Sequence, residues 1–141
     1  MNPPEPKQTT ILLAEDNDGL RYAFATHLRH KGFQVIEALH GLDALHRGRD
    51  YFGCIDMLVT DLTMPHLTGM AVADALRVQR PTLPVLFLTG ESIENLREGL
   101  GPMTAYLRKP CELEDVVLSS QRCKHRRCQS LPHGRLGAAV Y

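Results

Sequence analysis

Short apolar runs alternate with amphipathic segments along the whole chain. The apolar runs are rich in β-branched and aromatic side chains, as is typical of buried strands, and they lie at residues 10–14, 33–38, 54–60, 84–88 and 105–108. The segments between them predict helices, which run from Asn17 or Asp18 to His30 and over residues 41–48, 70–79, 92–99 and 112–123. This alternation predicts a flavodoxin-like (βα)5 fold, an α/β doubly wound parallel five-stranded sheet in the order 2-1-3-4-5.

Local signals support two of these helices in particular. The first has an apolar face at helical spacing, made of Leu20, Ala23, Phe24, His27 and Leu28. Asn17 or Asp18 supplies a side-chain cap at its start, and Gly32 supplies a stop at its end. In the second helix, Leu42 and Leu45 are expected to face the core.

Length and composition indicate one domain. The chain has 141 residues and no apolar stretch near the roughly 20 residues that span a bilayer. Residues 1–8 read as a flexible leader rather than a secretory signal, which predicts a cytoplasmic protein with reduced cysteines. Five of the 16 basic side chains and no acidic ones lie at 121–141, so a neutral total charge hides an acidic domain at 9–121 and a basic, flexible tail at 122–141.

Polar side chains stand where the predicted strands end. Glu15 and Asp16 follow the first strand, Asp61 the third, Thr89 the fourth and Lys109 the fifth. Parallel strands bring these ends to one edge of the sheet, where open α/β folds build their sites. Carboxylates about 4 Å apart repel by roughly 4 kcal/mol at an effective dielectric of 20, so such a cluster either shifts its pKa values or holds a cation. Mg²⁺ takes one or two protein carboxylates and suits this crevice.

The same set of groups suits phosphoryl transfer, which depends on positioning and on neutralising charge. Asp61 would be the nucleophile that receives the phosphoryl group. Thr89 would hydrogen-bond one of the phosphoryl oxygens, and Lys109 would form an ion pair with the carboxylate or with the phosphoryl group.

Four strings in unbroken order carry a family resemblance over about residues 9–121. They lie at residues 13–17 (LAEDN), 59–69 (VTDLTMPHLTG), 87–90 (FLTG) and 106–110 (YLRKP). Together they resemble the receiver domain of two-component response regulators. The resemblance implies that Asp61 accepts a phosphoryl group from a sensor histidine kinase or a histidine phosphotransfer protein. It also implies that Asp16, Asp61 and the backbone carbonyl of Thr63 bind Mg²⁺ (or Mn²⁺), with Glu15 acting through a water.

The resemblance further implies a switch. Thr89 and Tyr106 would respond to phosphorylation, the Lys109–Pro110 peptide would be cis, and Thr63 and Glu91 would tune the lifetime of the phosphorylated state. The signal would reach the face built by residues 92–99, 105–108 and 112–123, through which a homodimer could form. No output domain, enzymatic activity beyond slow self-dephosphorylation, specific nucleic acid or membrane partner is expected.

Several alternatives stay open beside this interpretation. The chain could be a pseudo-receiver that binds a partner constitutively, and Tyr106 could be an ordinary packed aromatic side chain. Asp56 is the rival phosphoacceptor, but its place at the start of the third strand predicts a surface or capping carboxylate. Cys111 departs from the family's usual phenylalanine, and the glycine-rich stretch at 99–103 is atypical.

Three other readings are disfavoured by the residues themselves. A dinucleotide-binding enzyme would need a glycine-rich turn after the first strand, where acids stand instead. A phosphatase of the haloacid dehalogenase kind would need an acid at Thr63. A tail metal site would lack the tight pair of cysteines typical of zinc ribbons; its candidate ligands are Cys123, His125, Cys128 and His133.

Overall fold

The computed structural model of the chain describes residues 8–90, 103–109 and 112–117. Its elements in chain order are β1 (Thr10–Ala14), α1 (Asp18–His30), β2 (Gln34–Ala38), α2 (Gly41–Asp50), β3 (Met57–Asp61), α3 (Gly69–Gln79), β4 (Val85–Thr89) and β5 (Thr104–Arg108). Residues 113–117 add a short helical stretch. The helix expected at 92–99, the second half of the last helix, the Lys109–Pro110 peptide and the tail lie outside the described residues.

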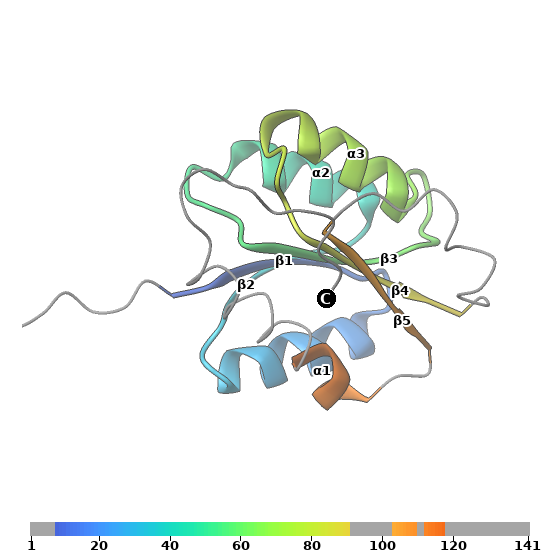
Figure 1. The fold of residues 1–141 in the computed structure, drawn as a ribbon. Coiled ribbons are helices and arrows are strands. Elements are labelled where there is room, and N and C mark those ends of the chain that lie inside the picture. The colour runs from blue at the N-terminus through green and yellow to red at the C-terminus, as the bar shows by residue number, and fades with distance from the viewer. Residues whose placement is uncertain (1–7, 91–102, 110–111, 118–141) are drawn as a thin grey trace, which may run out of the picture.

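The five strands form one parallel sheet in the order β2-β1-β3-β4-β5, which confirms the predicted fold. Figure 1 shows α2 and α3 on one face of the sheet, and α1 with the 113–117 stretch on the other. Every residue of β1, β3 and β4 is buried. A strand covered on both faces must be apolar throughout, which explains the continuous runs in the sequence.

Alternate side chains of each central strand enter different layers, because the side-chain period of a strand is two. Ile11 and Leu13 of β1 pack toward α1 with Phe24 and Leu28. Leu12 of β1 packs on the opposite side, in the layer that includes α2 and α3. The sheet is therefore the wall between two apolar layers, and its ends are the places left for polar chemistry.

The prediction for the inner face of α2 is wrong at Leu42, which is 43% exposed. The buried residues of this helix are Gly41, Ala44 and Gly48. A Cβ at Gly48 would lie 2.6 Å from a Leu76 methyl group of α3. The helix packs through its small residues because they allow a close approach, and this choice rotates Leu42 toward solvent.

Helix termini follow the predicted signals, while one strand boundary does not. The side chain of Asn17 accepts a hydrogen bond from the Leu20 amide at 2.9 Å, which confirms it as the cap of α1. Gly32, directly after the C-cap of that helix, has φ +97°, a conformation that favours glycine. The third strand begins at Met57 rather than at Cys54, which is exposed.

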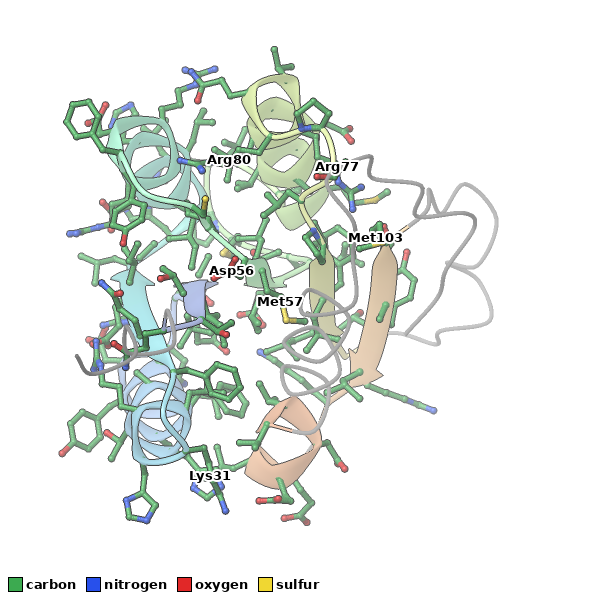
Figure 2. All side chains as sticks on the ribbon, turned by 60° about the vertical axis from the view of Figure 1, so that its left-hand side comes forward. Lys31, Asp56, Met57, Arg77, Arg80 and Met103 are labelled. Carbon is green, nitrogen blue, oxygen red and sulfur yellow. The ribbon has the colours of Figure 1, made fainter. Side chains whose placement is uncertain are left out.

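The amino end of the sheet holds charged side chains that bind backbone groups. Asp56 is buried rather than on the surface, and its Oδ2 accepts from the Thr10 amide at 2.8 Å, so the capping part of its prediction is confirmed. In Figure 2, Arg77 and Arg80 extend from the end of α3 toward neighbouring loops. The guanidinium group of Arg77 donates to the carbonyls of Leu83 and Met103. That of Arg80 donates to the carbonyls of Gly48, Tyr51 and Gly53.

No helix in the part of the chain that the structure describes is long and apolar enough to cross a membrane.

Candidate functional site

The carboxyl ends of four strands bring the predicted site residues to one edge. Glu15 follows β1, Asp61 is the last residue of β3, Thr89 ends β4 and Lys109 follows β5. The register fixes their relative height, because Asp61 pairs with Leu88 and the residue before Lys109 pairs with Thr89. Four segments that are far apart in sequence therefore meet at one place, as the strand pattern predicted.

Lys109 links two of the acids directly. Its Nζ lies 2.9 Å from Oε1 of Glu15 and 2.5 Å from Oδ1 of Asp61. Glu15, Asp16 and Asp61 each offer a carboxylate oxygen, and these three oxygens lie within 4.8 Å of one another. Glu15 is fully buried and Asp61 is 4% exposed, while Asp16 reaches solvent. The site thus has a buried floor and an open rim.

Backbone interactions hold the loops that carry these groups. The amide of Asn17 donates to Oε2 of Glu15 at 3.2 Å, and the amide of Lys109 donates to the carbonyl of Thr89 at 2.6 Å. The loop after Asp61 returns to the strand at Gly69, where an added Cβ would lie 2.1 Å from the Asp61 carbonyl oxygen. No other residue fits there without moving the backbone that presents Asp61.

The electrostatics of the site are those of two buried carboxylates that share one ammonium group. Burial and the neighbouring Glu15 carboxylate raise the pKa of Asp61 to about 8, although Lys109 opposes this shift. Burial also penalises the charged form of Glu15, but hydrogen bonds with Asp61, Lys109 and the Asn17 amide lower its pKa overall. Burial disfavours the charged form of Lys109, yet its contacts with Asp61 and Glu15 raise its pKa. Without a further cation, the two carboxylates retain one proton into the neutral pH range.

The residues present fit a divalent cation. Hard oxygen ligands are what Mg²⁺ prefers, and three carboxylates converge here against one ammonium group. Oδ1 of Asp61 is buried and has only its ion pair with Lys109, with no hydrogen-bond donor in good geometry among the described residues. A cation that joined this oxygen would relieve the repulsion that raises the Asp61 pKa.

The remaining predicted residues lie around this centre. Thr89 is buried at the end of β4, and Thr63 is exposed in the loop after β3. Tyr106 on β5 is half-buried and stacks on Phe87, with 5.5 Å between the ring centroids. Burial raises the pKa of the Tyr106 hydroxyl. Glu91 and Pro110 lie outside the described residues, so their predicted roles stay predictions.

Sequence reasoning missed Arg21, which touches the acidic loop. Arg21 lies on α1 with 8% of its surface exposed, and its Nη1 donates to the carbonyl oxygen of Glu15 at 2.7 Å. Its place one residue after Leu20 on the first turns of a helix gave a weak signal, because an arginine there is usually solvated. The sequence predicted no separate role for Gly69, and the close approach of its backbone to the Asp61 carbonyl oxygen explains why a glycine stands there.

Comparisons with known proteins agree with this arrangement. The family described as response regulator receiver domain matches residues 11–120. The chain is 31% identical over 111 residues to the sensor kinase CckA of Brucella abortus, covering 77% of the chain and 12% of that protein. It is also 31% identical over 113 residues to the probable transcriptional regulatory protein TcrX of Mycobacterium tuberculosis, covering 77% of the chain and 47% of that protein. The chain therefore spans from about a tenth to about half the length of these curated relatives.

Solved structures show the same likeness in three dimensions. A response regulator receiver protein from Sinorhizobium medicae superposes with a TM-score of 0.76 at 27% identity, covering 86% of this chain and 98% of that one. A receiver domain protein from Clostridium thermocellum gives a TM-score of 0.74 at 25% identity, covering 86% and 98%. With the family match, the sheet order and the acidic edge in agreement, this chain belongs to the response regulator receiver domain family of two-component signalling.

Proposed function

We propose that Asp61 accepts a phosphoryl group from a phosphohistidine on a sensor kinase or phosphotransfer protein, and that the chain thereby acts as a signalling switch. One observation carries this proposal. The carboxylate of Asp61 is buried against Lys109 and shares the carboxyl edge of the sheet with Glu15 and Asp16. A buried carboxylate with a counter-cation and a place for a metal is the equipment that acyl phosphate formation requires.

The transfer step follows from these groups. A carboxylate oxygen of Asp61 attacks the phosphorus atom, and the bond between phosphorus and the donor nitrogen breaks. The donor ring leaves as neutral imidazole, because its other nitrogen already carries a proton. Lys109 stays within reach of the carboxylate and pairs with the incoming phosphoryl oxygens.

Asp61, Asp16 and the backbone carbonyl of Thr63 would hold Mg²⁺, with Glu15 acting through a bound water. The bound ion supplies charge neutralisation for the phosphoryl oxygens. The chain's own contribution is to keep the acids converged, with Glu15 fixed on one side by Lys109 and on the other by the Asn17 amide. Hydrolysis of the phosphoryl group by the chain itself would be slow, and no further enzymatic activity is proposed.

The response would travel through Thr89 and Tyr106 to the surface that includes β5. Thr89 lies buried at the end of β4, and Tyr106 of β5 packs on Phe87, which is also on β4. A movement of Thr89 would therefore have a short path to Tyr106. The partner at this surface would be a second copy of the chain or another signalling protein. We propose that residues 9–121 form the working domain and that it acts in the cytoplasm.

Phosphorylation with a small donor tests the proposal. The protein is incubated with acetyl phosphate and Mg²⁺ and analysed by intact-mass spectrometry. Wild type should gain the mass of one phosphoryl group, and Asp61→Asn should gain none. Asp56→Asn is the matched control, because Asp56 is equally buried next to the same strand and yet should leave phosphorylation intact.

Two outcomes would contradict the proposal. If folded wild type gains no phosphoryl group from acetyl phosphate or from histidine kinases, the chain is a pseudo-receiver that binds its partner constitutively. If Asp61→Asn is phosphorylated as wild type is, the acceptor is another residue. Circular dichroism of each variant shows whether the comparison is made between folded proteins.

A further inference from the structure

Arg21 is a buried arginine that connects three segments near the acidic edge. Its Nη1 donates to the carbonyl oxygen of Glu15 at 2.7 Å, and its Nη2 contacts Oδ1 of Asp18 at 2.6 Å. Its Nε lies 3.7 Å from Oε1 of Glu37 on β2. Arginine is almost never buried without partners, and here the partners are the loop after β1, the first turn of α1 and the neighbouring strand.

The bond to the Glu15 carbonyl is the contact that matters for the site. That carbonyl belongs to the peptide group joining Glu15 to Asp16, so the guanidinium fixes the plane from which both carboxylates project. The side chain of Glu15 then runs to Lys109, while Asp16 reaches the open rim of the site. A charged donor makes a stronger and more directional hydrogen bond than water does at such a carbonyl.

We propose that Arg21 is a positioning residue for the metal site, holding the Glu15–Asp16 peptide so that both carboxylates face the cation. The proposal rests on the proposed function, because it assumes that a divalent cation binds at this edge. The side chain of Arg21 contacts the Glu15 carbonyl, Asp18 and Glu37, so its effect on the metal site would pass through the loop. Groups that orient metal ligands typically change metal affinity by about 10- to 100-fold when removed.

Arg29 provides a matched control on the same helix. Its Nη1 pairs with Oε2 of Glu37 at 2.9 Å, and its Nη2 donates to the carbonyl of Val35 at 2.9 Å. Both arginines thus join α1 to Glu37 and to one backbone carbonyl. Arg21 alone bonds the loop that carries the acids, and Arg29 lies two helical turns further along.

The experiment compares Mg²⁺ binding by wild type, Arg21→Met, Arg21→Lys and Arg29→Met. Isothermal titration calorimetry at pH 8 gives the dissociation constant for Mg²⁺ alone, and urea unfolding in EDTA gives the stability of each metal-free protein. Arg21→Met should weaken Mg²⁺ binding by about tenfold or more, and Arg29→Met should stay within about twofold of wild type. Arg21→Lys should fall between them, because an ammonium group restores one donor to the Glu15 carbonyl.

An Arg21→Met protein that is folded and binds Mg²⁺ within about twofold of wild type overturns the proposal. If Arg21→Met does not fold, Arg21→Lys decides: affinity equal to wild type overturns the proposal, and a severalfold loss with Arg29→Met unchanged supports it. Failure of the proposed function looks different. Wild type that binds Mg²⁺ but accepts no phosphoryl group refutes that function and leaves Arg21 as a metal-site positioning residue, whereas wild type without Mg²⁺ binding refutes both.

Discussion

Two aspartates stand at opposite ends of the third strand, and they use burial in opposite ways. Asp56 lies just before Met57, the first residue of β3, and Asp61 is the last residue of the strand. Each is 4% exposed. Asp56 accepts a hydrogen bond from the Thr10 amide at 2.8 Å, whereas Asp61 faces Lys109 and two further carboxylates.

The difference lies in what faces each carboxylate. A backbone amide is a fixed neutral dipole, so Asp56 completes the start of β1 and has a structural role. The groups around Asp61 carry full charges that do not balance, so a proton or a cation must join them. Burial alone therefore does not identify a reactive carboxylate, and the charge balance of its neighbours does.

Two arginines at the amino end follow the pattern of Asp56. Arg77 and Arg80, labelled in Figure 2, donate to backbone carbonyls, and Arg77 also donates to the hydroxyl of Thr104. The carboxyl end concentrates side chains that pair with one another. One end of the sheet thus closes the fold, and the other is left able to respond to its surroundings.

The largest expected effect is a dependence of Mg²⁺ affinity on pH. The pKa of Asp61 is raised to about 8, so a cation that binds at neutral pH must displace a proton. Affinity should rise about tenfold per pH unit from pH 6 toward pH 8, as one displaced proton requires, and then level off. Isothermal titration calorimetry in buffers of different ionisation enthalpy measures both the affinity and the proton release.

The same shift has a consequence for the metal-free protein. Because the folded pKa of Asp61 lies above its unfolded value, its contribution to stability is full below about pH 4 and is lost as pH rises to about 8. The lowered pKa of Glu15 acts in the other direction, adding stability above its usual range that is lost on acidification. An affinity for Mg²⁺ that does not change between pH 6 and pH 8 would contradict the shared proton, and Asp56→Asn should leave the profile unchanged.

Alanine substitutions at the two aspartates should change stability in different directions. Asp56→Ala leaves the buried Thr10 amide without this acceptor and should lower the free energy of unfolding by about 2 kcal/mol. Asp61→Ala removes one of two crowded carboxylates, so in EDTA at pH 7 it should leave stability unchanged or raise it. Urea unfolding of the metal-free proteins gives both free energies. An equal loss of stability in the two variants would contradict the different roles assigned to Asp56 and Asp61.

The strand pattern predicted this fold well because a central parallel strand is buried on both faces and must be apolar throughout. The same pattern placed Glu15, Asp61 and Lys109 at one edge, because parallel strands all end there. Asp56 was placed at the correct end of its strand, but its burial was missed. The sequence cannot distinguish an exposed aspartate from a buried one at this position. The difference depends on the Thr10 amide that Asp56 binds, which only the structure shows.

Helix α2 shows the limit of reading apolar side chains as the buried face. Its core side is made of Gly41, Ala44 and Gly48, and the predicted Leu42 faces solvent. Predictions from hydrophobic periodicity assume that large apolar side chains form the buried face of a helix. In α2 the buried face consists of small residues, and these allow the helix to approach α3 closely. The bond from Arg21 to the carbonyl of Glu15 could not be predicted for a related reason, because no pattern of side chains encodes a backbone acceptor.

Gly48→Ala tests the packing of α2 away from the site and should have a smaller effect. The new methyl group would meet the flexible methyls of Leu76 at 2.6 and 2.9 Å. Overpacking should lower the free energy of unfolding by about 1–3 kcal/mol. Replacing a helical glycine by alanine should raise it by about 1 kcal/mol, so we expect a net loss of stability of about 1 kcal/mol. Phosphorylation by acetyl phosphate should be unchanged, and Arg49→Ala on the exposed face of the same helix is the control for helix propensity.

The smallest expected effect is on stability and concerns His40, at the carboxyl end of the sheet. Like Asp56, its side chain accepts a hydrogen bond from a backbone amide. Nδ1 of His40 accepts from the Asp43 amide at 3.2 Å and caps α2. His40→Ala should lower the free energy of unfolding by about 0.5 kcal/mol, since this half-exposed amide finds water instead, and His40→Asn should cause no loss because asparagine is a favoured cap. Thermal unfolding of both variants beside Asp56→Ala makes the comparison. We expect the smaller loss for His40→Ala because the Asp43 amide is less buried than the Thr10 amide. Equal losses of stability in His40→Ala and Asp56→Ala would contradict this explanation.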